Sequence, residues 1–173
     1  MYVHSHGNVF STTVNAGGSM KITHGSATLT LVNSGGYMMV GGWSDATSTT
    51  VNAGGYMEIF HGSATSTMVN SGGSMYISKG SAILTLVNSG GHMYIYGGSA
   101  TSTTVNAGGS MYVDSQGNAF STTVNSGGNM YISNGGNAMS TTVKAGGVLY
   151  VDRGGTASIA FDPWSAGNVV SDS

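Results

Sequence analysis

The sequence predicts an all-β fold, a single-stranded parallel β-solenoid (β-helix) of about nine coils of 18–19 residues. The unit M-Y-V/I-x-x-G-x-A-x-S-T-T-V-N-A/S-G-G-x recurs from residue 1 to about residue 162 without a linker. Each copy holds two short β-prone runs separated by Gly-rich turns, and neither run is long enough for a helix. A copy this short cannot bury a core alone, so equivalent residues of successive copies must stack in ladders.

The first run of each copy places apolar residues at alternate positions. The residue that opens the run recurs with a spacing of 18 or 19 as Met1, Met20, Met38, Met57, Met75, Met93, Met111, Met130 and Leu149. Two positions later stands Val or Ile, from Val3 to Val151. Residues two apart on a strand share a face, so both columns are expected to form the core. The column between them contains Lys21 and Glu58 and is therefore expected to face outward.

Tyrosines dominate that outward column and form the predicted contact strip. The strip consists of Tyr2, Tyr76, Tyr94, Tyr112, Tyr131 and Tyr150. An aromatic row on one face of a rod can bind glycans or another rod. Cross-strand stacking that only stabilises a parallel sheet explains the same row, and the sequence leaves both interpretations open.

The second run has a small residue, mostly Ala, followed by alternating Thr and Val. We expect the column from Thr12 to Thr141 and the column from Val14 to Val143 to face inward. The opposite parity would bury Leu29, Leu31, Leu84 and Leu86 instead, and would present a flat Thr–Val ladder like the faces of ice-binding solenoids.

Asparagines precede the Gly-Gly turns and can hydrogen-bond along the rod as an amide ladder. This predicted structural ladder comprises Asn15, Asn33, Asn52, Asn70, Asn88, Asn106 and Asn125. Lys144 ends it, and the ninth copy drifts at Pro163 and Trp164. The expected organisation is a solenoid of nine repeats over 1–162 and a cap or exit segment over 163–173.

The composition excludes most chemistry. The six acidic residues are scattered over different columns and the chain has no Cys, so we predict no catalytic residue, no metal site, no cofactor and no enzyme. His6, His24 and His61 are interpreted as exposed turn residues, because metal capture would need further ligands.

Charge and hydropathy also limit the possible partners. Four Lys and Arg residues with a net charge of −2 provide no basic surface for nucleic acid. No apolar run spans a membrane and no signal peptide is visible, so export is expected to depend on regions outside this segment.

The unit S-T-T-V-N-A/S-G-G-x-M-Y-V/I resembles the repeat of AIDA-type autotransporter passengers, for example over 48–59, 102–113 and 121–132. The resemblance covers about 160 residues, and the sequence departs from it by placing Met-Tyr after the Gly pair. It implies a β-helical passenger at a bacterial surface that mediates adhesion, autoaggregation and biofilm formation. It also implies O-heptosylation of Ser or Thr, for which the candidates are Ser34, Ser71, Ser89 and Ser126.

The sequence thus predicts a non-enzymatic repeat segment, cell-surface or secreted, that acts in adhesion, self-association or biofilm and filament assembly. Repeated ladders add weak contacts by multivalency, and low charge leaves strand edges unprotected. The expected partners are other copies, lateral or end-to-end, or host and cell-surface glycans, without nucleic acid or direct membrane insertion. A glycan-binding or ice-binding flat-faced solenoid, or a passive surface spacer, is the alternative.

Overall fold

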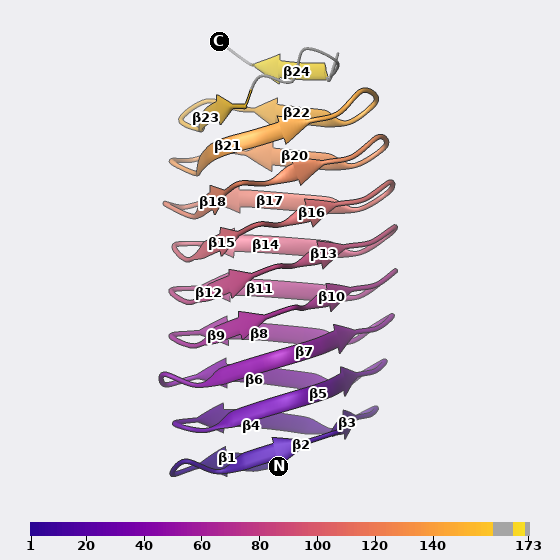
Figure 1. Cartoon of the computed structure of the whole chain (residues 1–173), viewed down its shortest axis with the longest axis vertical. Helices are drawn as coiled ribbons and strands as arrows, with labels where there is room; N and C mark the ends of the chain where they lie inside the picture. Colours follow the sequence, from indigo (N-terminus) through magenta and orange to yellow (C-terminus); the bar gives the residue numbers. More distant parts are fainter. Residues whose placement is uncertain (161–167, 172–173) are drawn as a thin grey trace.

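A computed structural model describes residues 1–160 and 168–171. Its coils are stacked along one axis, and each coil crosses two sheets that lie back to back (Figure 1). All elements in the described ranges are strands, so these ranges contain no helix that could cross a membrane. The predicted fold class, an all-β parallel solenoid of about nine coils, is confirmed.

Sheet A is built from the first run of each copy. Its ten parallel strands, in spatial order, are β1 (Tyr2–His4), β4 (Ser19–Thr23), β6 (Tyr37–Gly41), β8 (Tyr56–Phe60), β11 (Ser74–Ser78), β14 (His92–Tyr96), β17 (Ser110–Asp114), β20 (Asn129–Ile132), β22 (Val148–Val151) and β24 (Asn168–Ser171). The pairing stays in register, so Met75 lies between Met57 and Met93. Identical residues therefore form continuous columns along the rod.

Sheet B is built from the second run. Its strands are β2 (Asn8–Phe10), β3 (Thr13–Val14), β5 (Ser26–Val32), β7 (Asp45–Val51), β9 (Ser63–Thr65), β10 (Met68–Val69), β12 (Ser81–Ile83), β13 (Leu86–Val87), β15 (Ser99–Thr101), β16 (Thr104–Val105), β18 (Asn118–Phe120), β19 (Thr123–Val124), β21 (Asn137–Val143) and β23 (Thr156–Ile159). In most coils the run is split by a residue with positive φ, such as Ser66 at 57° and Ser102 at 56°. This kink changes the direction of the strand within the face.

The core lies between the two sheets and has the predicted composition. The Met and Val/Ile columns of sheet A and the Ala and Val columns of sheet B are buried from the second coil to the eighth. The Thr column from Thr30 to Thr141 is also buried. Leu29 and Leu84 are exposed, so the predicted parity of sheet B is confirmed. The Thr–Val ladder consequently cannot serve as a flat ice-binding face.

The change of repeat length between 18 and 19 residues is confined to one of the two turns of a coil. From the Ala column to the Val column and on to the next Met, the spacing is constant through the turn that contains Asn and Gly-Gly. From Ile22 to Ala27 there are five steps, whereas from Val40 to Ala46 there are six. We call the constant turn the Asn turn and the other the variable turn. They occupy the right and left edges of the rod in Figure 1.

The carboxyl-terminal end continues sheet A. Strand β24 pairs in parallel with β22 and so adds a strand beyond the nine repeats counted in the sequence. Ala157 is exposed, unlike the other members of its column from Ala27 to Ala138, so the core opens at this end. The predicted cap residues Pro163 and Trp164 lie outside the described residues.

Candidate functional site

The Tyr strip is a continuous stack of rings on the outer face of sheet A. Successive ring centroids from Tyr76 to Tyr150 are 4.4–4.9 Å apart, with interplanar angles between 3° and 16°. Adjacent coils hold the rings at the spacing of paired strands, so each ring lies on the next. Tyr2 is exposed and is separated from the stack by coils that carry Lys21 and Met39 in the same column.

Sequence reasoning missed that the stack extends through Tyr37 and Tyr56. These residues lie two positions before Met39 and Glu58, at the start of their strands. Their rings continue the row, with centroids 5.6 Å apart and a further 4.9 Å to Tyr76. The signal was present in the sequence, because positions two apart share a face and these two tyrosines occur where the main column lacks one.

The stacked arrangement determines what the strip can bind. The inner ring faces are occupied by neighbouring tyrosines, so the strip presents ring edges and hydroxyl groups to solvent. Tyr37 also donates a hydrogen bond of 2.6 Å to Glu58. Burial and the nearby Glu58 carboxylate raise the pKa of Tyr37 and Tyr56 above the usual value of 10.0.

The Asn ladder lies in the Asn turns. From Asn33 to Asn125, each side-chain Nδ2 donates to Oδ1 of the asparagine one coil earlier, over 2.8–2.9 Å. The glycine amides of these turns add backbone hydrogen bonds between coils, for example from Gly90 to Gly108 over 2.8 Å. The Asn turns are therefore bonded to one another through both side chains and backbone.

The candidate glycosylation residues lie in the same turns. Ser34, Ser71, Ser89 and Ser126 are all exposed, each directly after a ladder asparagine. In other coils the same position holds an alanine, such as Ala53.

The outer face of sheet B carries an apolar patch that was not predicted. The sheet-B patch consists of Leu29, Leu31, Met68, Leu84 and Leu86, all exposed. Together with Ser48 and Ser66, four of its members line a groove of 500 Å³. Leu29 and Leu84 also have φ of 56°, a conformation that an ordinary L-residue adopts at a cost of about 1–2 kcal/mol.

The variable turns carry a second cluster, which includes the predicted exposed turn histidines His6, His24 and His61. The residue three positions before the Ala column has positive φ in every coil. In the first five coils this variable-turn column consists of His6, His24, Trp43, His61 and Lys79. From the sequence, either Trp43 or Ser44 could occupy this position in the third coil and interrupt the histidines; the structure places Trp43 there and buries Ser44.

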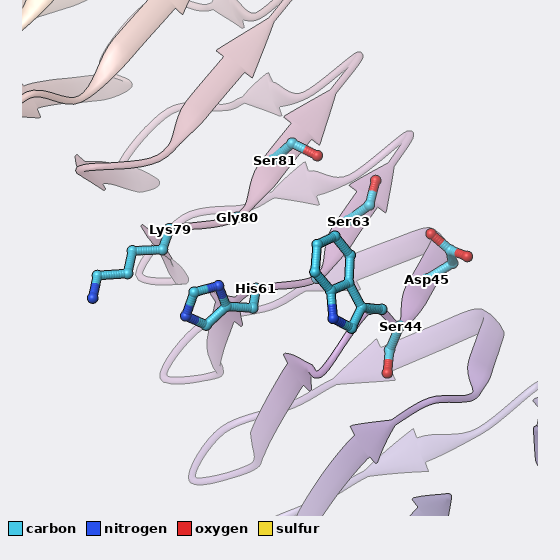
Figure 2. A pocket seen from close by; sticks show the side chains of 9 residues that line it. Ser44, Asp45, His61, Ser63, Lys79, Gly80 and Ser81 are labelled. Atoms are coloured by element: carbon cyan, nitrogen blue, oxygen red, sulfur yellow. The ribbon is translucent and has the colours of Figure 1, made fainter. Parts of the chain in front are cut away.

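Two hollows flank Trp43. One, of 370 Å³, is lined by Trp43, Asp45, His61, Lys79 and other residues. Figure 2 shows His61 and Lys79 on one side of this hollow, with Asp45, Ser63 and Ser81 on the other. The second hollow, of 430 Å³, is lined by Trp43 and Asp45 together with residues of the first two coils.

Among residues 1–160 and 168–171, no three His, Asp or Glu side chains lie close enough to hold a metal ion. Asp114, at the end of β17, is held by the hydroxyl groups of Ser115 and Ser133 and the amide of Asn134. Burial acts to raise the pKa of Asp114, but these hydrogen bonds outweigh it and lower the pKa below 3.8.

Comparison with known proteins identifies the class of protein to which this chain belongs. Residues 73–128 match the family model described as "Adhesin of bacterial autotransporter system, probable stalk". Among solved structures, the chain is similar to a TibC-catalysed hyper-glycosylated TibA55-350 fragment. That similarity has a TM-score of 0.74 and 35% sequence identity, and covers 99% of this chain and 77% of the TibA chain. No curated protein matches the sequence significantly.

The fold and its repeated faces define a β-helical passenger segment of a bacterial autotransporter. The chain belongs to the AIDA-type autotransporter adhesin family, as its repeats suggested. It is thus a repeat segment of a bacterial adhesin, of the kind that is displayed at the cell surface or secreted.

Proposed function

We propose that this segment is a non-enzymatic adhesin stalk that self-associates side by side through the sheet-B patch. The observation that carries the proposal is the exposure of five large apolar side chains on one face that has few charged residues. Exposed apolar clusters on soluble proteins mark interaction surfaces, because burial removes their contact with water.

The same face offers both halves of a self-complementary contact. Leu29 and Leu84 project from the second and fifth coils, and the groove between them passes over Ser48 and Ser66 of the third and fourth coils. A leucine of one copy can enter the groove of another copy, which is the reciprocal contact of a two-fold interface. Only six acidic and four basic residues occur in the chain, so charge repulsion between copies is weak.

The Tyr strip enters this proposal as a second contact surface. Its ring faces are stacked on one another, so Tyr76, Tyr94, Tyr112 and Tyr131 would contact a partner through hydroxyl groups and ring edges. Replacing the four by Phe keeps the stack and removes the hydroxyl groups. Weaker association of that variant would support the contact, and unchanged association would leave the strip as a stabilising stack.

We also propose that Ser34, Ser71, Ser89 and Ser126 accept O-linked sugars. The support is their exposure in the Asn turns and the TibC-catalysed hyper-glycosylation of the similar TibA fragment. Co-expression with a glycosyltransferase of that kind followed by peptide mass spectrometry tests this, with sugar expected at the four serines. Sugar confined to other residues would contradict it.

Sedimentation equilibrium tests the sheet-B patch directly. The repeat supplies the matched substitutions, because the same columns hold Ser or Thr in other coils. The variant therefore carries Leu29→Ser, Leu31→Thr, Met68→Thr, Leu84→Ser and Leu86→Thr. We expect at least about a ten-fold weaker association constant for the variant, with unchanged β-sheet circular dichroism. Equal association of both proteins would reject the patch.

The proposal has two further parts, the location of the segment and its division along the chain. We propose that the segment is presented at the bacterial surface, with residues 1–162 as its solenoid and 163–173 as a cap that includes β24, the last strand of sheet A. Pairing of rod ends would add end-to-end contacts to the lateral ones.

A further inference from the structure

Trp43 is the most exposed large apolar side chain of the described residues, at 84%. Its φ is 62°, and in the sixth, eighth and ninth coils the same position is Gly97, Gly135 and Gly154. A glycine adopts this conformation freely, whereas a bulky residue is strained there. Tryptophan at this position therefore adds neither core packing nor an easier turn.

Polar side chains line a hollow beside this indole; of these, His61 also packs edge-on against Phe60, with ring centroids 4.5 Å apart. Within the described part of the chain, the side chains of Asp45, His61 and Lys79 make no hydrogen bond or ion pair, although all three line one hollow with Trp43. Asp45 replaces the serine that neighbouring coils carry, since it pairs in register with Ser26 and Ser63. The third coil thus differs from the repeat at two nearby positions, one aromatic and one acidic.

We propose that Trp43 and Asp45 form the centre of a carbohydrate-binding site at the variable turns, which goes beyond the self-association proposed above. An exposed indole suits the apolar C–H face of a pyranose ring. The Asp45 carboxylate accepts hydrogen bonds from sugar hydroxyl groups, and the Lys79 ammonium and His61 imidazole supply further polar contacts. One acidic and one basic side chain in the hollow favour a neutral sugar over a charged one.

The size and position of the hollows fit a short oligosaccharide. Trp43 and Asp45 line both hollows, of 370 and 430 Å³, so one sugar unit can lie on each side of the indole. Both volumes lie in the usual range of small-molecule sites, and both hollows are open to solvent. The Tyr strip lacks this capacity, because its inner ring faces are covered by other tyrosines.

A printed array of neutral and sialylated oligosaccharides tests the site, using the whole chain with Trp164→Phe so that Trp43 is the remaining tryptophan. We expect binding to neutral oligosaccharides and a change of indole fluorescence when the bound sugar is titrated in solution. Trp43→Gly and Asp45→Ser should each weaken binding at least about ten-fold. Both variants carry residues that other coils hold at these positions, so their folds should be unaffected.

Gln116→Gly, in the same column four coils away, is the matched control and should bind like the parent. An array on which the parent binds no oligosaccharide, or binds only sialylated ones, would overturn the proposal. Equal binding by the parent and Trp43→Gly would do the same. Sedimentation equilibrium of Trp43→Gly separates this site from self-association, which should be unchanged; lost association with retained sugar binding would identify Trp43 as a protein contact instead.

Discussion

Both edges of the rod reverse the chain between the two sheets, but their turns differ in length and in side-chain hydrogen bonding. In the Asn turns the length is constant, and side-chain and backbone hydrogen bonds connect coil to coil. In the variable turns the length changes by one residue and the exposed column carries His, Trp, Lys, Gln or Gly. Backbone hydrogen bonds also connect some variable turns, for example from the Trp43 amide to the His61 carbonyl over 2.8 Å, but within the described residues the continuous Asn ladder occurs only in the Asn turns. The variable turns are thus freer to change length and to present side chains.

The largest expected effect concerns glycines crowded by a neighbouring coil, which occur at both edges, such as Gly91 in an Asn turn and Gly98 in a variable turn. A Cβ on Gly91, in an Asn turn, would lie 2.5 Å from the backbone oxygen of Val69, whereas one on Gly97, in a variable turn, would meet nothing closer than 3.6 Å. We expect Gly91→Ala to lower the free energy of unfolding by about 3 kcal/mol. Gly97→Ala should cost about 1–2 kcal/mol, from its positive φ alone. Urea denaturation measures both, and equal losses would contradict the comparison.

The next effect concerns the Asn ladder. Asn70→Ala removes the hydrogen bonds of Asn70 to Asn52 and Asn88 and leaves their half-buried partner atoms unpaired. We expect a loss of about 2 kcal/mol in the free energy of unfolding. Lys79→Ala, at the other edge, should change it by less than about 0.5 kcal/mol. A larger loss for Lys79→Ala than for Asn70→Ala would show that the variable turns hold the coils together.

Trp43→Gly should have a small effect of opposite sign. It relieves the strain of positive φ, about 1–2 kcal/mol, and increases the entropy of the unfolded chain by up to about 1 kcal/mol. We therefore expect a net gain of about 0.5 kcal/mol, seen as a slightly higher melting temperature. A clear drop in melting temperature would mean that Trp43 stabilises the fold and would weaken the case for a binding role.

The smallest expected effect is a local response to acid. The pKa of Asp114 is lowered in the folded state, so its contribution to stability is present above about pH 3.8 and is lost as the pH falls through the lowered pKa. Amide chemical shifts near Ser115, Ser133 and Asn134 should change in that range, while those of Gly90 and Gly108 in the Asn turns should not. Simultaneous changes at both edges would indicate global unfolding instead.

The sequence was sufficient to predict the solenoid, its inward columns and the position of the asparagines, because a parallel stack places equivalent residues in register. The sequence was insufficient to predict the position of a side chain that depends on the conformation of a turn or on a neighbouring coil. Because of the length change in the variable turn, the sequence left open whether Trp43 or Ser44 lies in the column of His24 and His61. Tyr37 and Tyr56 were missed because they lie two positions before the main Tyr column, although their rings join the same stack.

The apolar side chains of sheet B were visible in the sequence only as exceptions to a Ser and Thr pattern. Their exposure depends on the parity of the strand, and the kink at Leu29 and Leu84 depends on a backbone conformation that composition does not specify. The sequence therefore located the framework better than the surfaces.

Amide hydrogen exchange by NMR tests the division between the two edges most directly. The amides of Gly72, Gly90 and Gly108 donate to the next coil. Those of Lys79, Gly97 and Gln116, unlike those of Trp43 and Gly135 in the same column, have no backbone acceptor in the described ranges. We predict at least about ten-fold slower exchange for the first three than for Lys79, Gly97 and Gln116. Equal protection at the two edges, or slower exchange in the variable turns, would contradict the account.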